Sequence, residues 1–70
     1  MNLYLLERMG RADYEETEGA VVAAADGLDA LNVEVRGKPL GHVARWHVKL
    51  IGVAVEGLAH GLVLEDNRGS

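Results

Sequence analysis

The stretch WHVKLIGVAV, residues 46–55, decides the fold class of this chain. Its side chains alternate at a period of two and are rich in β-branched residues, which is typical of a strand with two different faces. One face carries Trp46, Val48 and Leu50, and the opposite face carries His47, Lys49, Ile51, Val53 and Val55. Gly52 interrupts the strand and predicts a bulge or a close backbone approach.

Three further strands are predicted, two before residues 46–55 and one after them. The apolar run LYLL in residues 1–8 predicts a central strand, and AVVAAA, residues 20–25, predicts a second one. The polar, glycine-bracketed segment 10–19 suits an exposed connection between antiparallel strands. After the glycine-bounded turn EGLAHG, residues 61–65 predict the last strand, and DNRGS, residues 66–70, predicts a polar tail.

Residues 26–45 are open to two interpretations. Asp26 is suited to cap a short helix, with Leu28 and Leu31 on one helical face. The alternation in residues 33–36 instead favours an extra hairpin, which Gly37 and Pro39 would interrupt. We expect a helix followed by a loop, with the hairpin as the alternative.

The predicted order is therefore strand, strand, short helix, strand, strand. This order predicts an α+β fold (β-β-α-β-β) in a single domain, residues 1–70, with a small four-stranded, mainly antiparallel sheet. The helix covers one face of this sheet, or a second subunit covers it where the helix falls short.

The composition limits the size of the core. The chain has 70 residues, of which 49% are hydrophobic, but it has no Phe, one Trp and no Cys. A domain of this size buries only about 60% of the surface that its unfolded chain exposes. Cores this small usually need a supplement, and disulfides are excluded, so we expect a homodimer.

Charge and hydropathy restrict the partners and the location. Eleven acidic and seven basic residues give a formal charge of −4, which disfavours direct nucleic-acid binding. No apolar run is long enough to span a membrane or to form a signal peptide, so the expected location is the cytoplasm and no membrane partner is expected.

The sequence shows no pattern of residues that carries catalysis or binds a metal. The three histidines, His42, His47 and His60, match no zinc spacing, and neither phosphate-binding glycine motif occurs. One serine, at the C-terminal end, and no cysteine exclude the usual nucleophile triads. We expect no catalytic residue, no metal, no cofactor and no enzyme activity.

The candidate protein-binding residues are an acidic cluster and two aromatic residues. The cluster places four carboxylates within six residues, and such a dense negative field suits docking on a basic protein surface; a solvated loop is the alternative. Trp46 is either the central packing residue of the core or a binding hot spot. The candidates are Asp13, Tyr14, Glu15, Glu16, Glu18 and Trp46.

Four segments carry a resemblance to known proteins: LYLLER, DYEETEGAVVAA, WHVKLIGVAVEG and GLVLEDNRG. In this order they resemble a group of small proteins from bacteriophages and prophages. The resemblance covers most of the chain and implies the strands, but no established activity. Similar proteins carry a helix rich in Glu and Ala where this chain has DGLDALNVEVRGKPLGHVAR. The resemblance therefore supports the predicted strands but not the predicted helix.

The architecture is also similar to that of several anti-CRISPR proteins. By this analogy we expect an inhibitor of a bacterial defence system that sterically blocks a host protein or nucleoprotein complex in the host bacterial cytoplasm. One alternative is a nucleotide-binding sponge, which needs several cations at one site, and only Arg36, Lys38 and Arg45 lie near one another in the sequence. The other is a structural or assembly protein of the phage.

Overall fold

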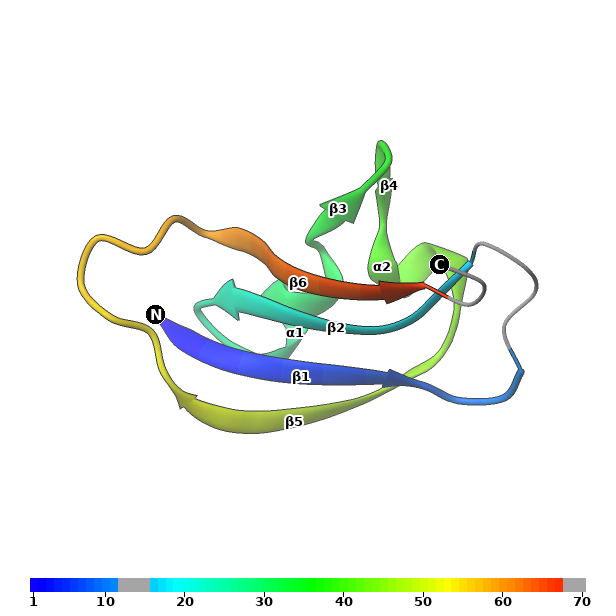
Figure 1. The fold of residues 1–70 in the computed structure, drawn as a ribbon, viewed down its shortest axis with the longest axis horizontal. Helices are drawn as coiled ribbons and strands as arrows, with labels where there is room; N and C mark the ends of the chain where they lie inside the picture. The colour runs from blue at the N-terminus through cyan, green and yellow to red at the C-terminus, as the bar shows by residue number, and fades with distance from the viewer. Residues whose placement is uncertain (12–15, 68–70) are drawn as a thin grey trace.

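A computed structural model describes residues 1–11 and 16–67, and it confirms the α+β class with a four-stranded antiparallel sheet. Figure 1 shows the elements along the chain. They are β1 (Asn2–Arg8), β2 (Thr17–Ala24), α1 (Gly27–Leu31), β3 (Glu34–Val35), β4 (Lys38–Pro39), α2 (Leu40–Val43), β5 (Trp46–Val53) and β6 (Gly61–Asn67).

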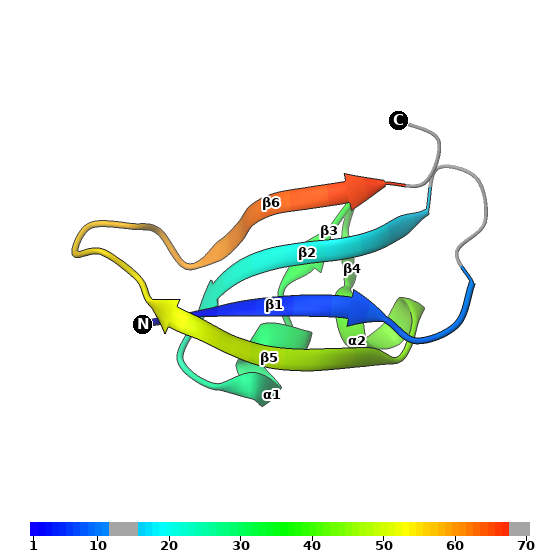
Figure 2. The same cartoon turned by 60° about the horizontal axis from the view of Figure 1, so that its bottom comes forward.

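The sheet has the order β5-β1-β2-β6, and every neighbouring pair is antiparallel. The N-terminal strand β1 is central, as its apolar run predicts. Both short helices and the β3-β4 ribbon lie on one side of the sheet, behind it in the view of Figure 2. The molecule is therefore two layers thick, with one sheet face covered by other elements and one face open.

The predicted interruption at Gly52 is confirmed as a shift of register between β1 and β5. Leu3 pairs with Gly52 and Tyr4 with Leu50, so Ile51 is the extra residue of a bulge. Val53 then pairs with Asn2 and lies on the face of Trp46, so the predicted assignment of Val53 to the opposite face is wrong. The strand also ends at Val53, two residues before the predicted end.

Residues 26–45 form both the helix and the hairpin that the sequence left open as alternatives. Asp26 caps α1, since its Oδ1 accepts a hydrogen bond from the Asp29 backbone N–H at 2.8 Å. The β3-β4 ribbon follows, with Arg36 (φ 53°) and Gly37 (φ 80°) as the two residues of its turn. Two successive residues with positive φ are typical of a tight type I′ hairpin turn.

Other details of the prediction need correction. The single predicted helix is two, since α2 follows the ribbon. Leu28, which the spacing placed on one helical face with Leu31, is 77% exposed, whereas Leu31 is half-buried. In α1 the buried residue is Ala30. The predicted polar tail begins too early, because β6 continues to Asn67 through its pairing with β2.

The core lies between the sheet and the helical layer. Tyr4, Leu6 and Val22 from the two central strands pack against buried side chains from the connecting layer. The core residues from that layer and from the neighbouring strand ends are Ala20, Ala24, Ala30, Val33, Leu40 and Trp46. The indole Nε1 of Trp46 donates a hydrogen bond to the Leu40 carbonyl at 2.7 Å, which fixes α2 to the start of β5.

The start of α1 is joined to the β5-β6 connection through Asp29. Its Oδ2 accepts a hydrogen bond from the Ala25 backbone N–H at 2.8 Å and lies 2.8 Å from His60 Nε2. The Ala25 N–H, followed by His60, holds the pKa of the Asp29 carboxyl below its ordinary value, because both contacts favour the charged form.

This contact predicts that stability depends on pH in the acid range. A carboxyl with a lowered folded pKa stabilises the fold above its unfolded pKa of about 3.9, and that contribution is lost as the pH falls through the lower folded pKa. The melting temperature of the parent protein should therefore fall more steeply below pH 4 than that of Asp29→Asn. Glu56→Gln, which removes an exposed carboxyl, is the control and should follow the parent. Parallel curves for all three proteins would contradict the assignment.

Candidate functional site

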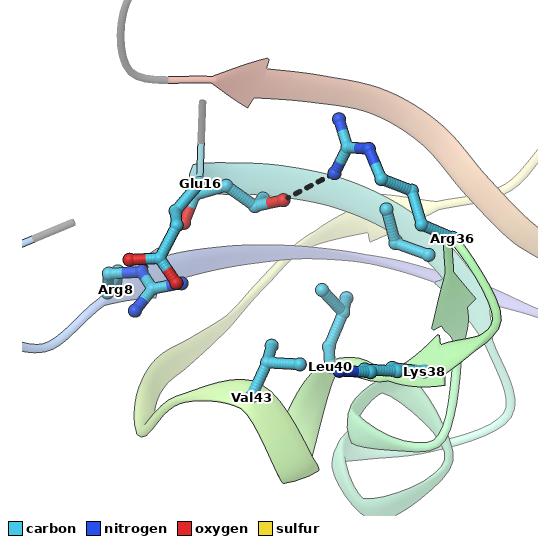
Figure 3. A pocket seen from close by; sticks show the side chains of 8 residues that line it. Arg8, Glu16, Arg36, Lys38, Leu40 and Val43 are labelled. Carbon is cyan, nitrogen blue, oxygen red and sulfur yellow. Dashed lines mark hydrogen bonds and ion pairs between the residues drawn. The ribbon is translucent and has the colours of Figure 1, made fainter. Parts of the chain in front are cut away.

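A cavity of about 310 Å³ opens between one end of the sheet and the β3-β4 ribbon. The ends of β1 and β2 form one wall, and the ribbon and α2 form the other. Figure 3 shows Arg8 and Glu16 on one side of this space and Arg36 and Lys38 on the other, with Leu40 and Val43 below. The lining residues are Arg8, Glu16, Thr17, Val35, Arg36, Lys38, Leu40 and Val43.

Arg8, at the end of β1, is held in place from three directions. Its Nε donates a hydrogen bond to the Thr17 carbonyl at 2.7 Å, and its guanidinium carbon lies 5.3 Å from the centre of the Trp46 ring. A terminal nitrogen lies 4.0 Å from a Glu16 carboxylate oxygen. The cation-π contact and the hydrogen bond orient the guanidinium, and only 11% of the side chain is exposed.

Arg36 reaches the cavity from the turn of the ribbon. Its two terminal nitrogens donate to the two carboxylate oxygens of Glu65, at 3.1 and 2.9 Å, in a bidentate pair. The Thr17 hydroxyl donates to the same carboxylate at 2.5 Å. Glu65 therefore joins the ribbon to β2 and β6 and fixes the orientation of Arg36.

Lys38 of β4 is the third cation that lines the cavity, and it is exposed to solvent. The floor of the cavity is apolar and consists of Val35, Leu40 and Val43. The site thus combines a cationic rim with an apolar floor. Arrangements of this kind bind organic anions, because the rim neutralises charge and the floor accepts carbon groups.

The second candidate surface is the open face of the sheet. Tyr4 and Leu6 point into the core, so the alternate residues of β1 point away from the helical layer. The register then places three cross-strand rows on the open face. These rows are Leu3, Ala23 and Gly61; Leu5, Val21 and Leu64; and Glu7, Gly19 and Asp66.

The open face therefore has an apolar centre and an acidic end. Ala23 is buried, Leu3, Leu5 and Val21 are half-buried, and Leu64 is 65% exposed. Glu7 and Asp66 are exposed on either side of Gly19, and Lys49 lies beside Leu5 on β5. Sequence patterns alone miss this face because it requires the register of the sheet.

The structure separates the predicted protein-binding residues. Asp13, Tyr14 and Glu15 lie outside the described residues. Glu16 lies on the cavity rim, and Glu18 is exposed at the register shift in β2. Trp46 is buried in the core beneath Arg8, so in this chain it is a packing residue of the core.

The sequence indicated only two of the three cations that line the cavity. Arg36 and Lys38 line the cavity, but Arg45, their neighbour in the sequence, does not. Arg8 takes its place from a distant strand. Its position at the end of the first strand, on the face of Tyr4 and Leu6, is the signal that could have identified it.

No group of three or more His, Asp or Glu side chains in the described ranges 1–11 and 16–67 is placed to hold a metal ion. No helix in that part of the chain is long and apolar enough to cross a membrane.

No protein-family model matches the chain, and no solved structure matches it. The chain is similar to the cysteine–tRNA ligase of Ralstonia nicotianae (strain ATCC BAA-1114 / GMI1000), with 44% identity over 54 residues. The match covers 74% of this chain but only 12% of the ligase. The chain therefore spans about an eighth of the length of this curated relative, a share that does not define a family.

The contact between Trp46 and Leu40 generates a stability prediction. Trp46→Phe keeps an aromatic side chain in the core but removes the hydrogen bond to the buried Leu40 residue, so we expect a loss of about 1–3 kcal/mol in the free energy of unfolding. Urea denaturation measures the loss. Leu28→Ala, at an exposed position, is the control and should change stability by less than about 0.5 kcal/mol. Equal effects of the two substitutions would refute this role of Trp46.

Proposed function

We propose that this chain is a non-enzymatic binding protein of a bacteriophage or prophage. It inhibits a bacterial defence system, in the manner of an anti-CRISPR protein, by covering part of a host protein or nucleoprotein complex in the bacterial cytoplasm. The observation that carries the proposal is the open face of the sheet, with its apolar centre and acidic end.

The apolar centre supports protein binding. The layers of a sheet domain usually bury apolar faces, and contiguous apolar patches left exposed on small proteins mark contact surfaces. Leu64 on β6 is exposed beside the half-buried Val21 and Leu5 of the two central strands. Burying this row against a partner removes apolar surface from water, which stabilises the complex.

The acidic end supports a partner with a basic surface. Glu7 and Asp66 flank Gly19. Because Gly19 has no side chain, an approaching partner can contact both carboxylates. Glu18 is exposed on the same strand end. Because nucleic-acid-binding grooves are rich in Lys and Arg, such a surface is complementary to them and competes with the nucleic acid.

A homodimer remains part of the proposal. On the covered face, the helical layer leaves Leu50 and Val53 of β5 exposed, although Leu50 pairs with the core residue Tyr4. These side chains continue the core beyond the end of the helical layer. A second copy of the chain is the occupant we propose here, because a core this small needs additional apolar contact.

The activity of the Ralstonia ligase is not extended to this chain, because the shared stretch is 12% of that enzyme. A structural or assembly role in the phage particle is the other interpretation, and it needs no host complex. The experiment below separates it from inhibition.

Charge reversal on the open face tests the proposed inhibition. The tagged parent protein and Glu7→Lys/Asp66→Lys are used to recover partners from a lysate of a bacterial host, with mass spectrometry as the readout. The control, Glu34→Lys/Glu56→Lys, changes the net charge by the same amount at exposed positions outside the face.

We expect the parent and the control to recover one nucleic-acid-processing complex, and the open-face variant to lose it by about tenfold or more, because reversing two carboxylates at a basic surface replaces attraction by repulsion. The purified complex should also lose nucleic-acid binding when the parent protein is added. Equal recovery by all three proteins, or recovery of phage particle proteins alone, would refute the proposed inhibition.

The proposed dimer is tested separately by sedimentation equilibrium. The parent should sediment as a dimer at micromolar concentration, and Leu50→Glu/Val53→Glu should sediment as a monomer, since carboxylates at the contact would be buried without partners. Leu64→Glu, on the open face, is the control and should stay dimeric. A monomeric parent, or a monomeric control beside a dimeric Leu50→Glu/Val53→Glu variant, would contradict this interface.

A further inference from the structure

We propose that the cavity beneath the β3-β4 ribbon binds a small organic phosphate, a phosphomonoester with a compact carbon body. This site lies on the covered side of the sheet, away from the open face. It is therefore a second binding function, independent of the proposed docking of a host complex.

The first argument is the convergence of cations. Arg8 from the end of β1 meets Arg36 and Lys38 from the β3-β4 ribbon at one cavity, in a chain whose formal charge is −4. Among the described residues, two carboxylates, those of Glu16 and Glu65, contact two of these cations, so the described groups around the cavity carry a net positive charge. An anion is the ligand that this local charge favours.

The contact distances indicate which cations meet the ligand. The 4.0 Å separation of Arg8 and Glu16 is longer than a hydrogen bond, so a phosphate oxygen closer to the guanidinium competes well with this carboxylate. Lys38 is exposed at the rim and supplies a flexible point charge. Arg36 lines the cavity while Glu65 holds it in position.

The backbone at Arg36 is a second, independent observation. Arg36 has φ 53°, a left-handed conformation that Gly, Asn and Asp adopt more readily. The turn of the ribbon requires positive φ at this position, so an arginine here costs about 1 kcal/mol or more. The cost is understandable if the guanidinium is needed at the cavity, where the turn and Glu65 preorganise it.

The size and floor of the cavity define the rest of the ligand. A volume of about 310 Å³ is at the lower end of small-molecule sites, and it exceeds what a free phosphate ion needs. The side chains of Val35, Leu40 and Val43 form an apolar floor, where a sugar or other carbon group is buried. An organic phosphate therefore fits both halves of the site, and inorganic phosphate fits one.

The test uses AMP as the probe, with adenosine and inorganic phosphate as comparison ligands, in calorimetric titration of the full chain. We expect saturable AMP binding that weakens as salt is added, weaker binding of inorganic phosphate, and no binding of adenosine. Lys38→Gln should weaken AMP binding about tenfold, which corresponds to the loss of one charge-assisted hydrogen bond. Lys49→Gln, the same change on the open face, should leave AMP binding unchanged.

A second variant separates the cation from the turn. Arg36→Asn keeps a residue suited to positive φ, so the ribbon should remain, as judged by an unchanged circular dichroism spectrum, while AMP binding weakens. The proposal is overturned if AMP shows no saturable binding at millimolar concentration, if adenosine binds as well as AMP, or if Lys38→Gln and Lys49→Gln bind AMP equally. Recovery of the host complex by Lys38→Gln shows that the two functions are separate.

Discussion

The structure depends on one constraint: a four-stranded sheet has two faces, and the described residues cover only one of them (Figure 2). The segment between β2 and β5 is the covering layer, and it packs on Tyr4, Leu6 and Val22. Every other surface of the molecule follows from this division. The covered face forms the core and the cavity, and the open face retains apolar side chains where the solvated face of an antiparallel sheet ordinarily carries polar ones.

The covering layer is short, and polar contacts stabilise it at both ends. Asp26 and Asp29 complete the hydrogen bonds at the start of α1, and the Trp46 indole binds the Leu40 carbonyl at the start of α2. Helices of four or five residues are not stable by themselves, because helix nucleation is costly. Their stability comes from these polar contacts and from packing on the sheet.

The two sides of the sheet also differ in charge. Carboxylates from two strands, Glu7 of β1 and Asp66 of β6, form the acidic end of the open face, whereas the cavity on the covered side collects three cations. Arg8 and Glu7 are neighbours in the sequence but point to opposite faces, because side chains alternate along a strand. A chain with an acidic excess thus presents an anionic surface and a cationic site on opposite sides of the same sheet.

Local patterns were sufficient for much of the fold. The alternation in residues 46–55, the apolar run in β1, the glycine at the bulge and the Asp26 cap each depend on neighbouring residues, and each was predicted. The β3-β4 hairpin is the alternative that the sequence ranks second, because Gly37 and Pro39 punctuate regular structure, yet it forms after the helix. The spacing placed Leu28 on one helical face with Leu31, yet only Leu31 packs against the core, because a helix of five residues has too few turns for spacing to define a buried face.

By itself, then, the sequence determined the α+β class, the four strands and the acidic, cysteine-free character of the chain, because these depend on periodicity, turn residues and composition. Only the tertiary structure decided which residues form the candidate sites. The cavity joins Arg8 to Arg36 and Lys38, and the open face joins Glu7 to Asp66. These groups are far apart along the chain, and strand order and register, which no local pattern specifies, bring them together.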